Sequence, residues 1–321
     1  MKITILDDYQ NAVRQLDCFS LLDGYHVNIL NKTYDNPTEL AEKIGDSQIL
    51  VLIRERTKID DKLLHLLPNL KLISQTGKIS NHLNLNACTK HEVAVAEGIG
   101  SPIGPAELTW ALIMNATRKI PQAVEAMKKG DWQTNIGSTI HGKTIGIWGY
   151  GKIGQMIAQY AKVFGANVQV WGSENSRNNA INDGLIANNT KEEFFKTSDI
   201  ISLHLRLNES TNGIVKLEDL MLMKKNVIIV NTARAELIEK NALNKALKLN
   251  NKLYAALDVY ETEPMYDVKD ELLKNSNVIC TPHLGYVEKN SYELYFSKAF
   301  ENVVNFIEGN PINIVNLEVL D

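Results

Sequence analysis

The sequence Thr144-Ile-Gly-Ile-Trp-Gly-Tyr-Gly-Lys-Ile-Gly154 decides the fold, because three of its glycines follow directly on a short apolar run. The run has the length and composition of a buried strand, and the residues after it have the pattern of a helix. Gly149 permits a tight turn, Gly151 lets a pyrophosphate approach the backbone, and Gly154 lets the helix pack close to the strand. The stretch therefore predicts a dinucleotide-binding βα unit.

The first residues of that helix, Lys152 and Ile153, are expected to take part in binding. Their backbone N–H groups lie in the first helical turn, where no carbonyl of the helix can accept from them. The helix dipole adds positive potential at the same end, and phosphate groups bind at such N-termini. We therefore expect the pyrophosphate of the dinucleotide at this turn.

The composition is that of a globular protein of about two domains. The chain has 321 residues, 44% hydrophobic and 22% charged, with a formal net charge of −4, and one domain per ~150 residues is the usual prior. This charge gives no reason to expect nucleic acid or a membrane surface as a partner, and no apolar run reaches the ~20 residues that span a bilayer.

The N-terminus lacks the pattern of a secretory signal. Three cysteines without paired spacing, Cys18, Cys88 and Cys280, favour a reducing cytoplasm and predict neither a disulfide framework nor a metal site.

Short apolar runs alternate with amphipathic stretches over nearly the whole chain. Such alternation predicts an α/β fold with two doubly wound, Rossmann-like parallel sheets. The glycine-rich stretch 98–102 separates the two series of strands. One long helix is expected over 105–129 and a last helix over 287–308. The expected strands are 2–6, 25–30, 48–53, 71–74, 92–95, 144–148, 167–171, 200–204, 227–231, 253–257 and 278–280.

The residues after the strand 167–171 bear on the choice of dinucleotide. The Rossmann pattern has an acidic residue here for the ribose hydroxyls of NAD, but Gly172 stands at its place. Glu174 could bind those hydroxyls instead, which favours NAD. Ser173 and Arg177 could hold a 2′-phosphate, which favours NADP, so both cofactors stay open.

Three later strands are each followed by a residue suited to proton or anion chemistry. Arg234, Glu263 and His283 stand a few residues past strand ends. The carboxyl ends of strands form the binding crevice of an open α/β sheet, so these side chains are expected to converge there. Hydride exchange with a hydroxy acid needs such a set, namely a cation for the carboxylate and carbonyl and a base for the hydroxyl proton.

The chain resembles the D-isomer-specific 2-hydroxyacid dehydrogenases in four motifs, which are Gly149–Gly154, Asn231-Thr-Ala-Arg234, Asp258-Val-Tyr-Glu-Thr-Glu-Pro264 and Thr281-Pro-His-Leu-Gly285. The resemblance covers nearly the whole chain. It implies that Arg234 binds the substrate carboxylate and carbonyl, that His283 is the acid–base residue, and that Glu263 pairs with His283.

The same resemblance implies contacts with the cofactor. Thr232 and Ala233 are expected beside the nicotinamide ring, and Asp258 on its carboxamide side. The other residues expected at the cofactor are His204, Leu205, Arg206 and Gly285, with Arg206 standing where the family usually has proline.

Substrate contacts are expected from the first series of strands. Arg54 stands where family members often contact the acidic end of the substrate, and Gly77, Lys78 and Ile79 occupy the family's substrate loop. Lys78 replaces a residue that is commonly small, and Tyr286 is expected to shape the pocket.

The family's architecture supplies the expected domains. Residues 1–100 with 284–321 are expected to form a discontinuous, flavodoxin-like substrate domain, and 101–283 the NAD(P)-binding Rossmann domain, with the active site in the cleft between them. The helix expected over 105–129 contributes to a homodimer in that family. The chain is expected to be too short for the extra C-terminal regulatory domain of long phosphoglycerate dehydrogenases.

The expected function is hydride transfer between NAD, or NADP, and a small D-2-hydroxy or 2-oxo acid such as glyoxylate or hydroxypyruvate. Two alternatives remain on the same fold. One is a dinucleotide-sensing binding protein similar to transcriptional corepressors, and the other is a dehydrogenase of the formate or phosphite type.

Overall fold

The computed structural model describes residues 1–320, which form two compact units. Unit 1 comprises Met1–Ser101 and the segment from Glu288 onward, and unit 2 comprises Pro102–Val287. Each unit is built on one parallel sheet, so the expected pair of parallel-sheet α/β folds is confirmed. Within residues 1–320, no helix combines the length and the apolar character that a membrane span requires.

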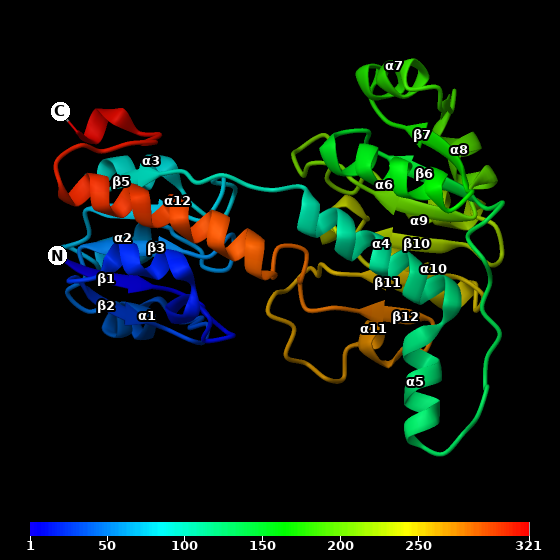
Figure 1. Cartoon of the computed structure of the whole chain (residues 1–321), viewed down its shortest axis with the longest axis horizontal. Coiled ribbons are helices and arrows are strands. Elements are labelled where there is room, and N and C mark those ends of the chain that lie inside the picture. Colours follow the sequence, from blue (N-terminus) through cyan, green and yellow to red (C-terminus); the bar gives the residue numbers. More distant parts are fainter. Residues whose placement is uncertain (321) are drawn as a thin grey trace. The chain divides into compact units, whose positions relative to one another are not determined.

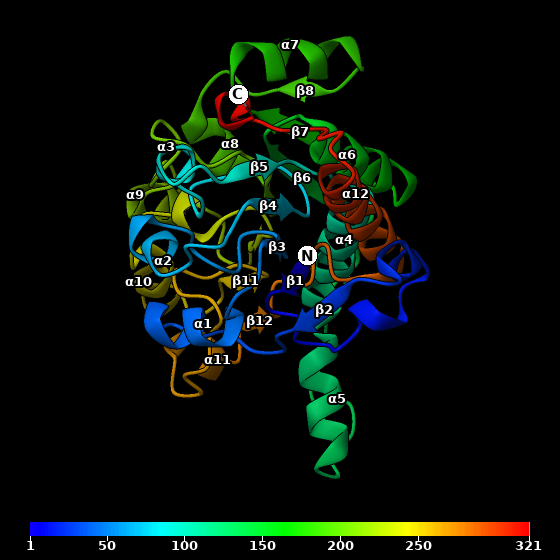
Figure 2. The same ribbon diagram turned by 90° about the vertical axis from the view of Figure 1, so that its left-hand side faces the viewer.

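Unit 1 contains a five-stranded parallel sheet in the order β2-β1-β3-β4-β5. Its strands are β1 (Lys2–Ile5), β2 (His26–Ile29), β3 (Ile49–Leu52), β4 (Leu72–Gln75) and β5 (Ala94–Ala96). Figure 2 shows α1 (Pro37–Ile44), α2 (Asp61–His65) and α3 (Leu85–Lys90) on one side of this sheet and α12 (Lys289–Ile307) on the other. Because helices cover both faces, the central strands β3 and β4 are buried at every position.

Unit 2 contains a seven-stranded parallel sheet in the order β12-β11-β10-β9-β6-β7-β8 (Figure 1). Its strands are β6 (Thr144–Trp148), β7 (Asn167–Trp171), β8 (Ile186–Ala187), β9 (Ile200–Leu203), β10 (Ile228–Asn231), β11 (Tyr254–Leu257) and β12 (Val278–Cys280). The strand order reverses at β6, which pairs with β7 on one side and β9 on the other. A dinucleotide crevice is expected at the carboxyl end of such a strand.

Eight helices accompany this sheet within the described residues. They are α4 (Ile103–Arg118), α5 (Ile120–Lys128), α6 (Lys152–Val163), α7 (Glu174–Asn182), α8 (Lys191–Thr197), α9 (Leu217–Leu222), α10 (Ala242–Leu249) and α11 (Glu271–Lys274). One apolar cluster joins α4 and α6 to the sheet through Ile113 and Ile157, and a second joins α8 and α10 to it through Phe194 and Ala246. These two clusters fix the strand ends that carry the candidate site residues.

The expected single helix over 105–129 is wrong. The chain forms two helices, because Lys119 adopts a left-handed conformation with φ 54° between α4 and α5. Pro121 lies in the first turn of the second helix, and because a proline has no backbone N–H it could not donate to the Thr117 carbonyl in one continuous helix. α4 packs into the core of unit 2, whereas no residue of α5 is buried.

The strand pattern was a better guide than the helix pattern. Every expected strand is present, with ends within two residues of those expected. The two-residue strand β8 was missed because so short a run leaves no alternation to detect. The expected last helix corresponds to α12 in unit 1.

Candidate active site

The glycine turn after β6 is tightly packed on its own backbone and open on one side. A β-carbon built on Gly154 would lie 2.2 Å from the carbonyl oxygen of Gly149, so only glycine lets α6 start this close to the turn. A β-carbon on Gly149, where φ is 100°, would lie 2.7 Å from the carbonyl oxygen of His204. Gly151 has no such neighbour within 4 Å. The turn therefore fits a dinucleotide, because its backbone is accessible where the pyrophosphate binds.

The order of the strands places the three candidate catalytic residues at one edge of the sheet. Arg234 follows β10, while Glu263 and His283 follow β11 and β12. These are neighbouring parallel strands, so their carboxyl ends lie together. The glycine turn stands at the same edge, two strands beyond β10.

His283 and Glu263 form a direct pair. The Nδ1 atom of His283 lies 2.5 Å from Oε2 of Glu263, and both side chains are about one-third exposed. A carboxylate only accepts hydrogen bonds, so Nδ1 carries the proton and Nε2 is left for other partners. The other carboxylate oxygen of Glu263 accepts from the backbone N–H of Tyr260 at 2.8 Å, which fixes the carboxylate in turn. This is the arrangement of an oriented acid–base residue.

Asp258 holds the turn that carries His283. Its carboxylate accepts from the hydroxyl of Thr281 at 2.6 Å and from the backbone N–H groups of Leu284 and Gly285 at 2.7 and 2.9 Å. Asp258 is fully buried, and burial raises its pKa above the usual aspartate value. His283 itself has φ 51°, a conformation that these bonds support. A contact of Asp258 or Gly285 with the cofactor stays a prediction.

Two side chains hold the loop that carries Arg234. The amide of Asn231 accepts from the N–H of Ala233 at 3.1 Å and donates to the carbonyl of Arg234 at 2.8 Å. The hydroxyl of Thr232 lies 2.7 Å from that of Thr109 on α4. The guanidinium of Arg234 donates to the carbonyl of Ala233 at 2.6 Å. The sequence motif gave no role to Asn231, and nothing in the sequence could have paired Thr109 with a residue 123 positions later.

The residues expected at the adenosine ribose lie beside the glycine turn. The N–H of Gly149 donates to the carbonyl of Trp171 at 3.0 Å, which joins the end of β7 to the turn. Ser173 is the N-cap of α7 and accepts from the N–H of Ser176 at 3.3 Å. Glu174 is exposed in the first turn of α7, and Arg177 packs on the Trp171 ring with its guanidinium carbon 5.1 Å from the ring centre.

The segment after β9 meets the glycine turn from the other side. The carbonyl of His204 and the side chain of Leu205 are the atoms nearest to a β-carbon built on Gly149. The His204 ring is hydrogen-bonded to Ser202, with Nε2 2.8 Å from Oγ, and the Arg206 side chain is exposed. This places the backbone of 204–205 at the crevice.

His204 makes the stability of the protein depend on pH. Burial lowers its pKa from 6.5 to about 4. The unfolded chain therefore takes up a proton near pH 6.5 that the folded chain refuses, and stability falls as the pH drops from about 6.5 toward 4. Between about pH 7 and pH 5 we expect H204Q to lose about 2 kcal/mol less unfolding free energy than the wild type. Urea unfolding at both pH values measures the difference, and equal losses would contradict it.

In unit 1 the expected substrate residues lie at the carboxyl ends of β3 and β4. The Arg54 guanidinium lies against Gly77 so closely that a β-carbon there would be 1.9 Å from Nη1, and it donates to the carbonyl of Thr76 at 3.3 Å. Lys78 is ion-paired with Glu97 at 2.5 Å, and the N–H of Ile79 donates to the same carboxylate at 2.9 Å. Gly77 is therefore required by Arg54, and Lys78 has a partner in Glu97, directly after β5, that the sequence did not suggest.

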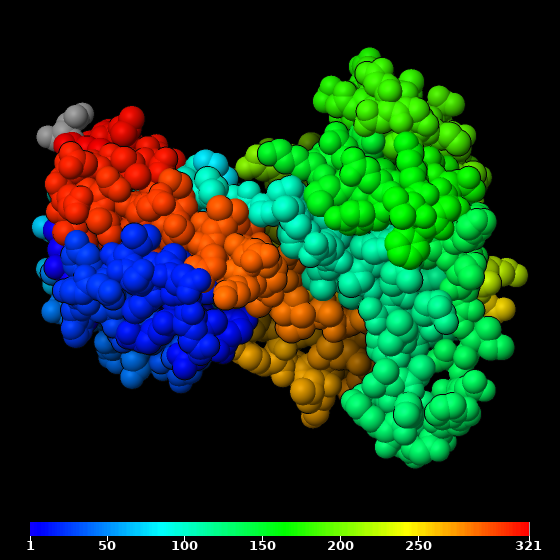
Figure 3. Space-filling view, viewed as in Figure 1, coloured from blue at the N-terminus to red at the C-terminus, as the bar shows by residue number. Residues whose placement is uncertain are grey.

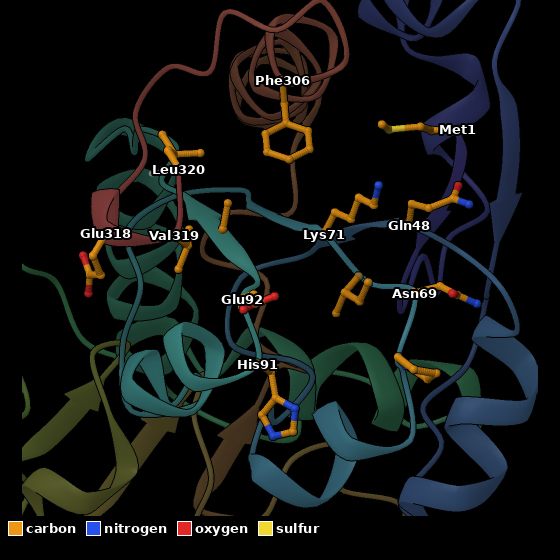
Figure 4. A pocket seen from close by; sticks show the side chains of 13 residues that line it. Met1, Gln48, Asn69, Lys71, His91, Glu92, Phe306, Glu318, Val319 and Leu320 are labelled. Atoms are coloured by element: carbon orange, nitrogen blue, oxygen red, sulfur yellow. The ribbon is translucent and has the colours of Figure 1, made fainter.

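A cavity of about 770 Å³ in unit 1 is separate from these residues (Figure 4). Its lining includes Met1, Gln48 and Lys71, which precede β1, β3 and β4. It therefore lies at the amino-terminal edge of the sheet, whereas ligands of open α/β sheets bind at the carboxyl edge. Among the described residues no group of three or more His, Cys, Asp or Glu side chains is arranged to hold a metal ion.

Comparison with known proteins agrees with this geometry. Residues 110–285 match the family model for the NAD-binding domain of D-isomer-specific 2-hydroxyacid dehydrogenases. The chain is 36% identical over 283 residues to D-3-phosphoglycerate dehydrogenase of Methanocaldococcus jannaschii, covering 87% of this chain and 53% of the other. It is 33% identical over 292 residues to glyoxylate reductase of Thermococcus litoralis, covering 88% and 87%.

A solved structure of a phosphoglycerate oxidoreductase from Vibrio cholerae O395 is 52% identical, with a TM-score of 0.95 and coverage of 96% of this chain and 99% of the other. The chain spans about half the length of the phosphoglycerate dehydrogenases that it matches from M. jannaschii and Bacillus subtilis. Residues 110–285 are thus assigned to an NAD-binding domain, and the chain belongs to the D-isomer-specific 2-hydroxyacid dehydrogenase family.

Proposed function

We propose that this chain is an NAD-dependent oxidoreductase that interconverts a small D-2-hydroxy acid and the corresponding 2-oxo acid. The observation that carries the proposal is the His283–Glu263 pair at the same sheet edge as Arg234 and the glycine turn of an NAD-binding domain. Acid–base and anion-binding groups at a dinucleotide crevice match the needs of hydride transfer to a carbonyl.

The residues divide the chemistry between them. Arg234 binds the substrate carboxylate and polarises the carbonyl, because a guanidinium presents several donors to oxygen atoms in one plane. Nε2 of His283 gives a proton to the carbonyl oxygen in reduction and takes it back in oxidation. Glu263 accepts the hydrogen bond from Nδ1 and so fixes the orientation of the imidazole, with Nε2 left for the substrate. The bound nicotinamide supplies or accepts the hydride.

Asn231 and Asp258 act as positioning residues in this proposal. Asn231 spans the Arg234 loop, and Asp258 spans the turn of His283. Neither needs to touch the substrate, and their bonds keep the two reactive side chains at fixed places on the sheet edge.

The substrate class follows from the shared part of the candidate acids. Glyoxylate, hydroxypyruvate, pyruvate and phosphohydroxypyruvate all carry a carboxylate beside a carbonyl, which suits Arg234. The matched relatives include phosphoglycerate dehydrogenases and glyoxylate reductases. Arg54, Gly77, Lys78 and Ile79 remain our proposed contacts for the distal end of the substrate, and unit 1 is the proposed substrate domain.

Oxidation of NADH with a panel of these 2-oxo acids tests the proposal. We expect turnover with at least one acid, detected by the loss of reduced nicotinamide absorbance. Two further measurements test the alternatives. One is the reduction of NAD with formate or phosphite, and the other is a search for peptides that bind the protein. Turnover of formate or phosphite alone, or peptide binding with no turnover of any 2-oxo acid, would overturn the proposal.

We also propose that the chain forms a homodimer through α5 and the segment after it. The side chains of Ile120, Val124 and Met127 follow a helical spacing and are 42%, 45% and 65% exposed, and Trp132 and Ile136 are 75% and 91% exposed. Figure 3 shows this segment projecting from the rest of unit 2. Adjacent apolar side chains with such exposure are typical of a surface that another chain covers.

The double variant V124E/M127E tests this dimer. Charges at these positions place like-charged groups in the proposed interface, so we expect the species of twice the chain mass to give way to a monomer. Light scattering coupled to gel filtration measures the mass, and V163E, at an exposed position on α6, is the control. A wild-type monomer, or a double variant that stays dimeric, would contradict the proposal.

We also propose that the protein works in the cytoplasm. Cys18, Cys88 and Cys280 are all free thiols in the structure. Free thiols are kept reduced in the cytoplasm, where NADH is available.

A further inference from the structure

The substrate loop of unit 1, residues 77–79, is held by the two residues that follow β5. The loop comes soon after β4, and β4 and β5 are neighbouring parallel strands, so both segments lie at the carboxyl edge of the sheet. The N–H of Gly98 donates to the carbonyl of Gly77 at 2.8 Å. A β-carbon on Gly98 would lie 2.5 Å from the nitrogen of Gly77, so only glycine allows this approach. The first residue of the loop is therefore fixed from the end of β5.

The carboxylate of Glu97 holds the other two residues of the loop. Its Oε1 accepts from the N–H of Ile79 at 2.9 Å, and its Oε2 accepts from Nζ of Lys78 at 2.5 Å. One side chain thus fixes both the path of the backbone and the position of the ammonium group. A glutamine at this position could make only the first contact, because an amide nitrogen does not accept a hydrogen bond from an ammonium.

The backbone of Glu97 is itself anchored on both sides. Its N–H donates to the carbonyl of Asn313 at 3.0 Å, and its carbonyl accepts from the side-chain amide of Asn302 on α12 at 3.1 Å. Asn302 is buried, and its amide oxygen accepts from the side chain of Asn313 at 2.8 Å. Glu97 is therefore a fixed support, of the kind that keeps ligand-binding groups at defined places.

The two members of the ion pair differ in exposure. The Lys78 side chain is 68% exposed, whereas that of Glu97 is 15% exposed. An ion pair with so exposed a lysine contributes little to the stability of the fold. The carboxylate nevertheless offsets the charge of the ammonium for any anion that approaches the loop. The pair thus has a larger consequence for a charged ligand than for folding.

We propose that Glu97 is a positioning residue that sets the substrate specificity of this loop. It holds Lys78 and Ile79 in place for every 2-oxo acid. By offsetting the Lys78 charge it weakens the binding of acids with an anionic distal group relative to acids with an uncharged one. The inference rests on the proposed function and on the proposed contact of the loop with the substrate.

The kinetics of E97Q with two acids test the effect of charge. Hydroxypyruvate and phosphohydroxypyruvate differ only in the distal phosphate. The glutamine keeps the bond to Ile79 and releases the ammonium, so we expect KM for phosphohydroxypyruvate to fall about fivefold, while KM for hydroxypyruvate and both kcat values stay within about twofold. The double variant E97Q/K78Q is expected to lose this gain, because no ammonium remains. A merely structural role of Glu97 would raise KM for both acids.

The variant E97A tests the positioning. It removes both contacts, so we expect KM for hydroxypyruvate to rise about tenfold, the effect of one hydrogen bond to a charged group, and E97Q to restore it. Hydrogen exchange at the Ile79 amide is expected to be faster in E97A than in E97Q or the wild type, and it needs no turnover. E301Q is the matched control, since Glu301 pairs with Lys298 on α12 of the same unit at 2.6 Å. Circular dichroism checks that each variant is folded.

The outcomes separate this inference from the proposed function. Equal changes of the two KM values in E97Q overturn it, as does a wild-type KM for hydroxypyruvate in E97A. An acid that binds without being reduced is compared by its inhibition constant in place of KM. If the wild type neither binds nor reduces these two acids but turns over glyoxylate, this inference alone is refuted. Absence of turnover with every 2-oxo acid overturns the proposed function and this inference together.

Discussion

Replacement of His283 by alanine is expected to lower kcat by about 10²- to 10⁴-fold, the usual contribution of general acid–base catalysis. The imidazole is the one group in the proposed site that is held by a carboxylate on one nitrogen and leaves the other for the substrate. The variant removes the proton donor without disturbing Asp258, whose three bonds keep the turn in place. Steady-state reduction of the preferred 2-oxo acid measures the effect.

Controls distinguish lost chemistry from lost structure. H141A removes an exposed histidine of unit 2 just before β6, at the amino-terminal edge of the sheet, and is expected to keep wild-type kcat. NADH affinity of H283A, measured by calorimetry, is expected to stay within a few-fold of the wild type. A kcat of H283A close to that of the wild type would remove His283 from the proposed role.

Replacement of Arg234 by alanine is expected to lower kcat/KM by about 10³-fold or more, with a rise in KM and a fall in kcat together. The guanidinium serves both the carboxylate, present throughout the reaction, and the carbonyl oxygen, which gains charge only as hydride arrives. R234K keeps the charge and loses the planar set of donors, so it is expected to recover only part of the activity.

The same kinetics separate the two roles of Arg234. A rise in KM alone would reduce its role to binding of the carboxylate. R118A, which removes an exposed arginine at the end of α4, is the control and is expected to behave as the wild type. Wild-type kcat/KM in R234A would contradict the assignment of the anion site.

The sequence predicted the fold to the extent that local patterns determine it. Continuous apolar runs identified the strands because helices cover both faces of each sheet. The sequence did not predict the break at Lys119, because the residues of α4 and those of α5 both have a helical pattern. The break depends on the left-handed conformation of the single residue before Ile120-Pro121. The sequence also did not predict the short strand β8, because pairing with β7, rather than its own composition, makes it a strand.

The sequence predicted the residues of the candidate site but not the hydrogen bonds that hold them in place. Motifs named Arg234, Glu263 and His283, and the strand order explains why residues so far apart in sequence stand at one edge. The supporting bonds of Asn231, Asp258 and Thr109 could not be predicted, because they depend on the path of each loop. Likewise the pairing of Lys78 with Glu97 joins residues 19 apart through the packing of β4 against β5.

The central claim is that hydride passes between the nicotinamide and C2 of a 2-oxo acid at the edge formed by β10, β11 and β12. Reduction with NADH deuterated at the transferable C4 position tests it most directly, with the product examined by NMR and by chiral chromatography. We predict one deuterium at C2 of a D-2-hydroxy acid. A product of L configuration, or NADH oxidation without deuterium at C2, would contradict the account.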